Sequence, residues 1–147
     1  NEGNMSVEVF IEEVNFNGLK AKMTLTVALA PAVMQAMYER GVRLNSTPSG
    51  KRITLAPADV KEVRAAPLSS LTYLPTASLD EAIISKHFGT PSERIKETAN
   101  GEIHWLYAQH GLDVMLGSNQ KAVLQYVPLK DFELLRAPLL KNGAVIQ

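Results

Sequence analysis

The feature that most constrains this chain is a turn signal near its start. Asn17-Gly18 lies between two runs in which apolar and polar residues alternate. Asn-Gly is the preferred pair for a two-residue hairpin turn, because both central positions need a positive φ angle. Such a turn would place Phe16 opposite Leu19 and Val14 opposite Ala21, with all four on one face. We therefore predict that the chain starts with an antiparallel β-hairpin.

The first of the two runs changes parity partway along. Its apolar residues are odd-numbered from Val7 to Ile11, whereas Val14 and Phe16 are even-numbered. One extra residue at Glu12-Glu13 would restore a single apolar face, because a β-bulge shifts the alternation by one. We therefore predict a bulge in the first strand.

Proline and glycine mark the elements that follow. Pro31 suits the first turn of a helix, and Gly41 is suited to end it. Short strands are predicted at 43–44 and 52–55 around a turn at 47–50, then a helical turn at 59–65 and a strand at 71–74.

The second half has clearer boundaries. Ser78 and Glu81 have the spacing of a capping box at a helix start, and Gly89 is expected to stop that helix. Strands are predicted at 94–98, 102–107, 112–116 and 121–127, with a short helix at 130–136. The predicted fold class is α+β, with one or two antiparallel sheets and short helices packed on one face.

The chain length fits one domain. With 147 residues, it is near the usual single-domain size, so we predict one domain over 1–147. Residues 53–68 align without gaps to 124–139, and both segments carry a strand, a proline and an Ala-Pro-Leu ending. This internal similarity suggests two related helix-plus-sheet halves, 1–75 and 76–147.

Composition excludes several classes of function. The chain has 15 basic and 15 acidic residues, so it lacks the basic excess typical of nucleic-acid binding. It has no cysteine, which removes disulfides and thiolate metal sites. No apolar run approaches the roughly 20 residues that span a bilayer. The chain begins at Asn1 rather than Met, which is expected after cleavage of an export signal or after truncation.

No catalytic motif is present. The sequence has neither a Gly-x-Ser-x-Gly elbow nor a glycine-rich phosphate loop. His104 and His110 have Glu102 and Asp113 nearby, but their spacing is not the tight, repeated spacing of metal ligands. We therefore predict no catalytic residue, no metal site and no cofactor, and an enzyme is the less favoured interpretation.

Trp105 and Tyr107 are the most informative large side chains. They share parity with Ile103, so all three would point to one face of a strand. That face is either core or an exposed patch for a partner, since Trp and Tyr are enriched at binding hot spots. His104 and Leu106 would lie on the reverse face. Burial of Leu106 as well would make the strand central and weaken the patch interpretation.

Residues 78–127 carry a resemblance. A short capped helix is followed by Phe88-Gly89-Thr90-Pro91, and then by strands with Trp105-Leu106-Tyr107, Leu112-Asp113-Val114 and Lys121-Ala122-Val123. This order resembles the small outer-membrane lipoprotein domains of the SmpA/OmlA type, which are related in fold to the β-lactamase inhibitor proteins. The resemblance covers about a third of the chain. It implies helices on an antiparallel sheet and a non-enzymatic function in binding proteins.

The functional hypothesis is a cell-envelope binding or scaffolding domain, periplasmic or associated with the outer membrane. Trp105, Tyr107 and His110 are the residues expected to contact the partner, which would be another envelope protein. Contact with a membrane is expected only through a lipid anchor upstream of Asn1. Two alternatives stay open: a carrier of a small ligand or lipid, and a small metal-dependent hydrolase using His104 and His110.

Overall fold

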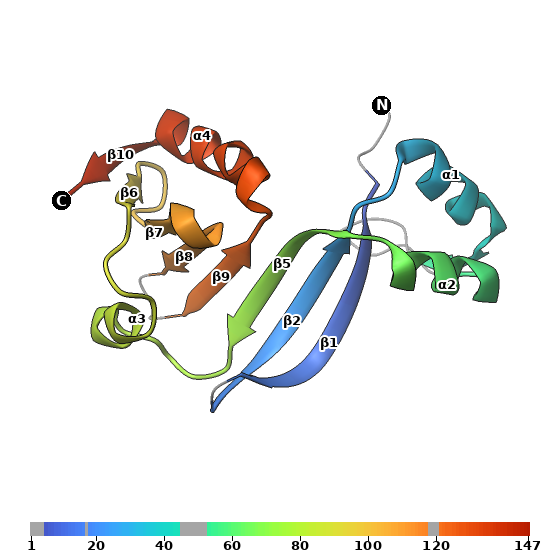
Figure 1. Ribbon diagram of the computed structural model, residues 1–147, viewed down its shortest axis with the longest axis horizontal. Helices are drawn as coiled ribbons and strands as arrows, with labels where there is room; N and C mark the ends of the chain where they lie inside the picture. Colours follow the sequence, from blue (N-terminus) through green and yellow to red (C-terminus); the bar gives the residue numbers. More distant parts are fainter. Residues whose placement is uncertain (1–4, 17, 45–52, 118–120) are drawn as a thin grey trace. The chain divides into compact units, whose positions relative to one another are not determined.

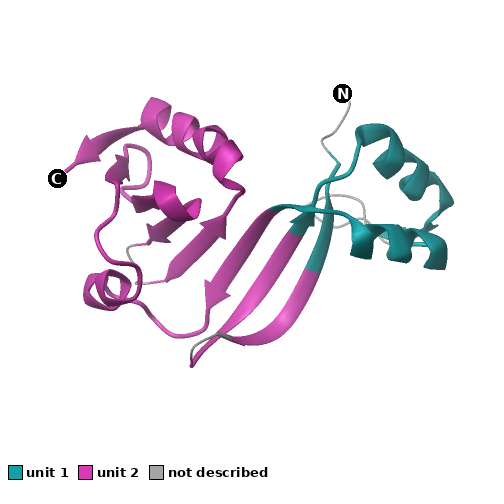
Figure 2. Cartoon of the chain, viewed as in Figure 1, with its two compact units in different colours: residues 1–9, 26–69 teal, residues 10–25, 70–147 magenta. Residues whose placement is uncertain are grey.

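The computed structural model describes residues 5–16, 18–44, 53–117 and 121–147. The chain divides into two compact units (Figure 2). Unit 1 contains residues 1–9 and 26–69, and unit 2 contains 10–25 and 70–147. The boundaries between the units fall at 9–10, 25–26 and 69–70. The single domain with two related halves stays a prediction.

The fold class is α+β, as predicted. Eight strands form one antiparallel sheet in the order β1-β2-β5-β9-β8-β7-β6-β10. These strands are β1 (Val7–Phe16), β2 (Leu19–Val27), β5 (Leu68–Pro75), β6 (Glu93–Glu97), β7 (Ile103–Tyr107), β8 (Leu112–Leu116), β9 (Ala122–Tyr126) and β10 (Gly143–Ile146). A second sheet pairs β3 (Val42–Arg43) with β4 (Ile53–Thr54), where paired short strands were predicted. The turn predicted at 47–50 lies outside the described residues.

Among the described residues, four short helices accompany the strands (Figure 1). They are α1 (Pro31–Arg40), α2 (Pro57–Ala65), α3 (Glu81–Phe88) and α4 (Phe132–Asn142), with 3₁₀ turns at η1 (Ala108–His110) and η2 (Leu129–Asp131). Within the described ranges, no helix combines the length and the apolar character needed to cross a membrane.

The hairpin predicted at the start is confirmed. β1 and β2 are neighbours in the sheet, and Gly18 has a φ of 84°, the left-handed conformation that an Asn-Gly turn needs. Asn17 itself lies outside the described residues. The bulge and the pairing of Phe16 with Leu19 stay predictions.

Unit 1 has its own small core. Val27, Met37 and Val63 are buried together, and they come from β2, α1 and α2. Helix α1 begins at Pro31, as predicted, and Gly41 follows its last residue. Arg40 at the end of α1 makes a two-point ion pair with the buried carboxylate of Asp59 on α2. This pair links the two helices of unit 1.

The start of α3 differs from the prediction. The N-cap is Asp80 rather than Ser78, and its Oδ1 accepts a hydrogen bond of 2.8 Å from the N–H of Ile83. Leu79 before the cap and Ile84 in the helix are both buried in one cluster. This arrangement is a hydrophobic staple, and it fixes where the helix begins. Gly89 stops the helix, as predicted.

Strands β6 to β9 form an antiparallel meander covered on both faces. Trp105, Tyr107 and Val114 pack in one cluster with Ile84 of α3. Residues on the reverse face, including Leu106 and Ile95, pack with Phe132 of α4. The two helices therefore cover opposite faces, whereas the sequence suggested helices on one face. The sequence of β7 alone could not show whether the helices cover one face of the sheet or both, because its apolar residues occur at odd and at even positions.

The end of the chain also differs from the prediction. The helix expected at 130–136 continues through Pro138 to Asn142, because Leu135, Leu139 and Leu140 keep packing on the core. Strand β10 then pairs with β6, with Val145 opposite Ile95. This strand was not predicted, because it depends on pairing with β6 rather than on a local pattern.

Candidate functional site on strand β7

Strand β7 is central and buried on both faces. Trp105 is 4% exposed and Tyr107 is fully buried, on the face toward α3. Leu106 is also fully buried, on the face toward α4. Because β7 is covered on both faces, Trp105 and Tyr107 lie inside the core. In this fold they are not exposed at a surface that a partner could contact.

Trp105 and Tyr107 each make one contact with a polar group. The guanidinium of Arg94 lies 4.4 Å from the centre of the Trp105 ring, a cation–π arrangement. The hydroxyl of Tyr107 donates a hydrogen bond of 3.2 Å to the carbonyl of Gly89. Of the three residues expected to contact a partner, His110 alone is exposed, in the turn after β7.

The reverse face of β7 carries a buried ion pair. His104 Nδ1 lies 2.7 Å from Oδ2 of Asp113 on β8, and both side chains are buried. Leu106 is opposite Asp113 in the β7–β8 register, so His104 and Asp113 share the α4 face diagonally. A carboxylate only accepts hydrogen bonds, so Nδ1 carries the proton of this bond.

Two carboxylates lie beside this pair at the β6–β7 hairpin. The N–H of Glu97 donates 2.9 Å to the carbonyl of Glu102, so the two residues are neighbours across the hairpin. Between them, Asn100 Nδ2 donates to Glu97 Oε2 at 2.7 Å and to Glu102 Oε2 at 2.9 Å. One side-chain amide thus holds both carboxylates.

These groups converge on His104. Its Nε2 lies 3.7 Å from Oε1 of Glu97, and one ligand atom each of Glu97, Glu102 and His104 lie within 4.8 Å of one another. Within the part of the chain that the structure describes, Nε2 of His104 and Oδ1 of Asp113 are buried atoms without a hydrogen-bond partner. We call Glu97, Glu102, His104 and Asp113 the β7 acid cluster.

The β7 acid cluster favours a positive charge at its centre. Burial opposes the charged imidazolium and by itself lowers the pKa of His104. The hydrogen bond to Asp113 and the negative charges of Asp113, Glu97 and Glu102 outweigh it. The pKa of His104 is therefore raised above its ordinary value of 6.5.

Sequence reasoning found part of this cluster. His104, Glu102 and Asp113 were named as neighbours in the sequence, and the structure brings them together. His110 is exposed beyond the other end of β7. Glu97 and Asn100 were missed. A two-residue turn at Asn100-Gly101 would place Glu97 opposite His104. The observed register pairs Lys96 with Ile103 around a four-residue loop, so Glu97 lies opposite Glu102 instead.

Comparison of this chain with protein-family models, with curated proteins and with solved structures found no match. These comparisons neither support nor contradict the SmpA/OmlA resemblance of residues 78–127. Membership of that family stays a prediction.

Proposed function

We propose that this chain is a binding domain rather than an enzyme, and that it binds an extended segment of another protein along the free edge of β1. The main supporting observation is the position of β1 at one end of the strand order. A terminal strand has one row of backbone N–H and C=O groups without a strand partner, and an extended peptide can pair with that row.

Strand β1 lacks two features that commonly protect an edge, a short length and a lysine or proline on the strand. It is ten residues long, whereas β10 at the opposite end has four. Its sequence has no lysine and no proline, the residues that commonly block pairing at an edge. Phe10, in the part of β1 that belongs to unit 2, is 53% exposed. An exposed aromatic ring beside free backbone groups can anchor a partner strand.

The charge of β1 indicates the chemistry of the partner. Glu8, Glu12 and Glu13 are exposed on this strand. Glu13 contacts Lys20 at 3.4 Å, but both side chains are mostly exposed, so the pair is weak. A second copy of β1 would bring like charges together, whereas a segment rich in lysine or arginine would complement them. The proposed partner segment is therefore extended and basic.

The cell-envelope setting is part of the same proposal. It is supported by the resemblance of residues 78–127 to SmpA/OmlA-type domains, and it makes another envelope protein the expected partner. Fractionation of cells that make the full-length protein, with mass spectrometry of its N-terminus, tests the setting. An acylated, membrane-associated product is expected, and an unprocessed cytosolic product would contradict it.

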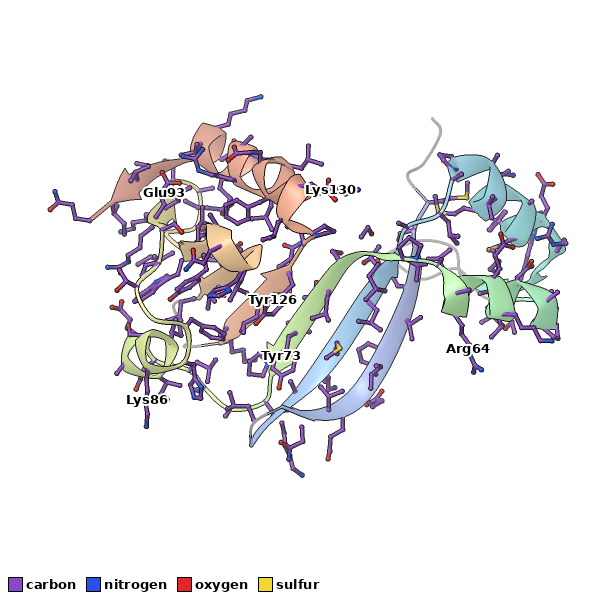
Figure 3. The ribbon with its side chains drawn as sticks, viewed as in Figure 1. Arg64, Tyr73, Lys86, Glu93, Tyr126 and Lys130 are labelled. Carbon is purple, nitrogen blue, oxygen red and sulfur yellow. The ribbon has the colours of Figure 1, made fainter. Side chains whose placement is uncertain are left out.

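A photo-crosslinking amino acid at position 10 tests the binding surface. In the full-length protein in its own cells, it should give one discrete product. The same photo-crosslinking amino acid in place of Lys86, which is exposed on α3 (Figure 3), should give no cross-linked product.

The product obtained from position 10 should contain an extended basic segment, and a synthetic peptide of that segment should bind the purified chain. Glu12→Lys should weaken this binding several-fold. Equal cross-linking from both positions, or unchanged binding by Glu12→Lys, would contradict the proposal.

A further inference from the structure

Three side chains converge at the turn end of the β6–β7 hairpin. Glu97, Glu102 and His104 each offer one ligand atom, and these atoms lie within 4.8 Å of one another. Carboxylates often meet at a protein surface without binding an ion. The imidazole of His104 is therefore the group that decides whether this cluster is a site.

His104 has a buried nitrogen that the described residues leave without a partner. The residue is 6% exposed, and its Nδ1 is already bonded to Asp113. Its Nε2 has no hydrogen-bond partner and lies 3.7 Å from Oε1 of Glu97, too far for a hydrogen bond. A buried polar atom left unpaired is unfavourable, so Nε2 indicates a partner that these residues do not supply.

The separation of the ligand atoms fits a metal ion better than a direct contact. Zinc binds imidazole nitrogen and carboxylate oxygen at about 2.1 Å, so two ligands of a tetrahedral zinc lie about 3.4 Å apart. The 3.7 Å between Nε2 of His104 and Oε1 of Glu97 is close to that value. The third ligand atom, on Glu102, lies within 4.8 Å of the other two.

The surrounding groups already orient these ligands. Asp113 accepts the Nδ1 proton of His104, which leaves Nε2 as the nitrogen that faces the two glutamates. Carboxylate–histidine pairs of this kind fix the tautomer of metal-binding histidines. Asn100 occupies Oε2 of both glutamates and leaves the other oxygen of each for an ion.

We propose that Glu97, Glu102 and His104 bind one divalent transition-metal ion, with Asp113 and Asn100 positioning the ligands. One imidazole and two carboxylates suit zinc, manganese or iron, whereas calcium and magnesium prefer oxygen ligands alone. Three protein ligands leave a fourth position for water. The bound ion would tie the end of β6 to the start of β7, independently of binding at β1.

Zinc titration of the full chain tests this site. The untagged protein, stripped with a chelator and then freed of it, should bind one equivalent of Zn²⁺ by isothermal titration calorimetry at pH 7.5. Zn²⁺ should also raise the Tm, because a ligand that binds only the folded state stabilises it, and EDTA should reverse the rise. Absence of stoichiometric binding would overturn the proposal.

Matched variants locate the site. Glu97→Gln and Glu102→Gln remove a ligand charge while keeping side-chain shape, and each should weaken Zn²⁺ binding more than about tenfold. Asp113→Asn should weaken it about 10- to 100-fold, as for other residues that orient a metal ligand. Three variants of exposed side chains serve as controls: Glu62→Gln in unit 1, and His87→Ala and His110→Ala in unit 2. Each should bind Zn²⁺ like the wild type.

Nε2 of His104 can carry a proton or bind a metal ion, but not both. Nitrogen NMR distinguishes the two states. Addition of one equivalent of Zn²⁺ should shift the Nε2 resonance of His104 to that of a metal-bound imidazole and leave His87 and His110 unchanged. If His104 stays an imidazolium in excess Zn²⁺, or if Glu97→Gln and Glu102→Gln bind like wild type, the cluster is a buried ion pair and not a metal site.

Discussion

His104 donates a hydrogen bond of 2.7 Å from Nδ1 to Oδ2 of Asp113, which joins the neighbouring strands β7 and β8 on the face covered by α4. Both side chains are buried, so the bond lies where water does not compete with it. The pair also determines which imidazole nitrogen faces Glu97. It therefore connects the core of unit 2 to the β7 acid cluster.

Removal of one partner of this pair should be strongly destabilising. Asp113→Ala leaves His104 buried without its acceptor, and we expect the free energy of unfolding to fall by about 3 kcal/mol. The double variant His104→Leu, Asp113→Leu removes both polar groups and should lose much less. Urea unfolding of the wild type, His104→Leu, Asp113→Leu and the double variant measures the coupling. A coupling near zero would contradict a stabilising pair.

The stability of the metal-free chain should depend on the protonation of His104. Its pKa is raised in the folded state, so the charged imidazole stabilises the fold below pH 6.5, the ordinary value for the unfolded chain. This contribution is lost as the pH rises through the folded pKa. An NMR titration in chelator should give a pKa above 6.5 for His104, and Asp113→Asn should lower it. A value below 6.5 in the wild type would contradict the electrostatic account.

Truncation of Trp105 tests its assignment to the core. Trp105→Ala removes a buried ring and its contact with Arg94, and we expect a loss of about 3–5 kcal/mol in the free energy of unfolding. His110→Ala, on the exposed turn that follows β7, should change it by less than about 0.5 kcal/mol. Chemical denaturation measures both. A stable Trp105→Ala variant would return Trp105 to the surface-patch interpretation.

The start of α3 gives a local test of the fold. Asp80→Ala removes the side chain that accepts from Ile83, and it should lower the free energy of unfolding by about 1 kcal/mol. Ser78→Ala, at the position that the capping-box pattern favoured, should have an effect below about 0.5 kcal/mol. The opposite order of effects would place the cap at Ser78.

Local signals predicted most of the fold because they act over a few residues. Asn17-Gly18 located the first hairpin, and Gly89 located the end of α3. The missed features depend on contacts between distant segments. β10 is a strand because it pairs with β6, and α4 passes Pro138 because its leucines pack on the core.

The candidate site was only partly predictable for the same reason. The sequence places Asp113 nine residues from His104, and only the β7–β8 register brings their side chains together. The β6–β7 hairpin brings Glu97 to the same face as His104. Residue spacing along one strand could not show either contact, because both depend on which strands are neighbours.

Hydrogen exchange of the β1 amides tests the proposed function most directly. The free, ¹⁵N-labelled chain is compared with the chain bound to the basic peptide identified by cross-linking at position 10. Strand addition predicts that amides in residues 10–16 gain protection in the complex, because their outward N–H groups become hydrogen-bonded. Protection confined to other elements, with no change along β1, would contradict binding at this edge.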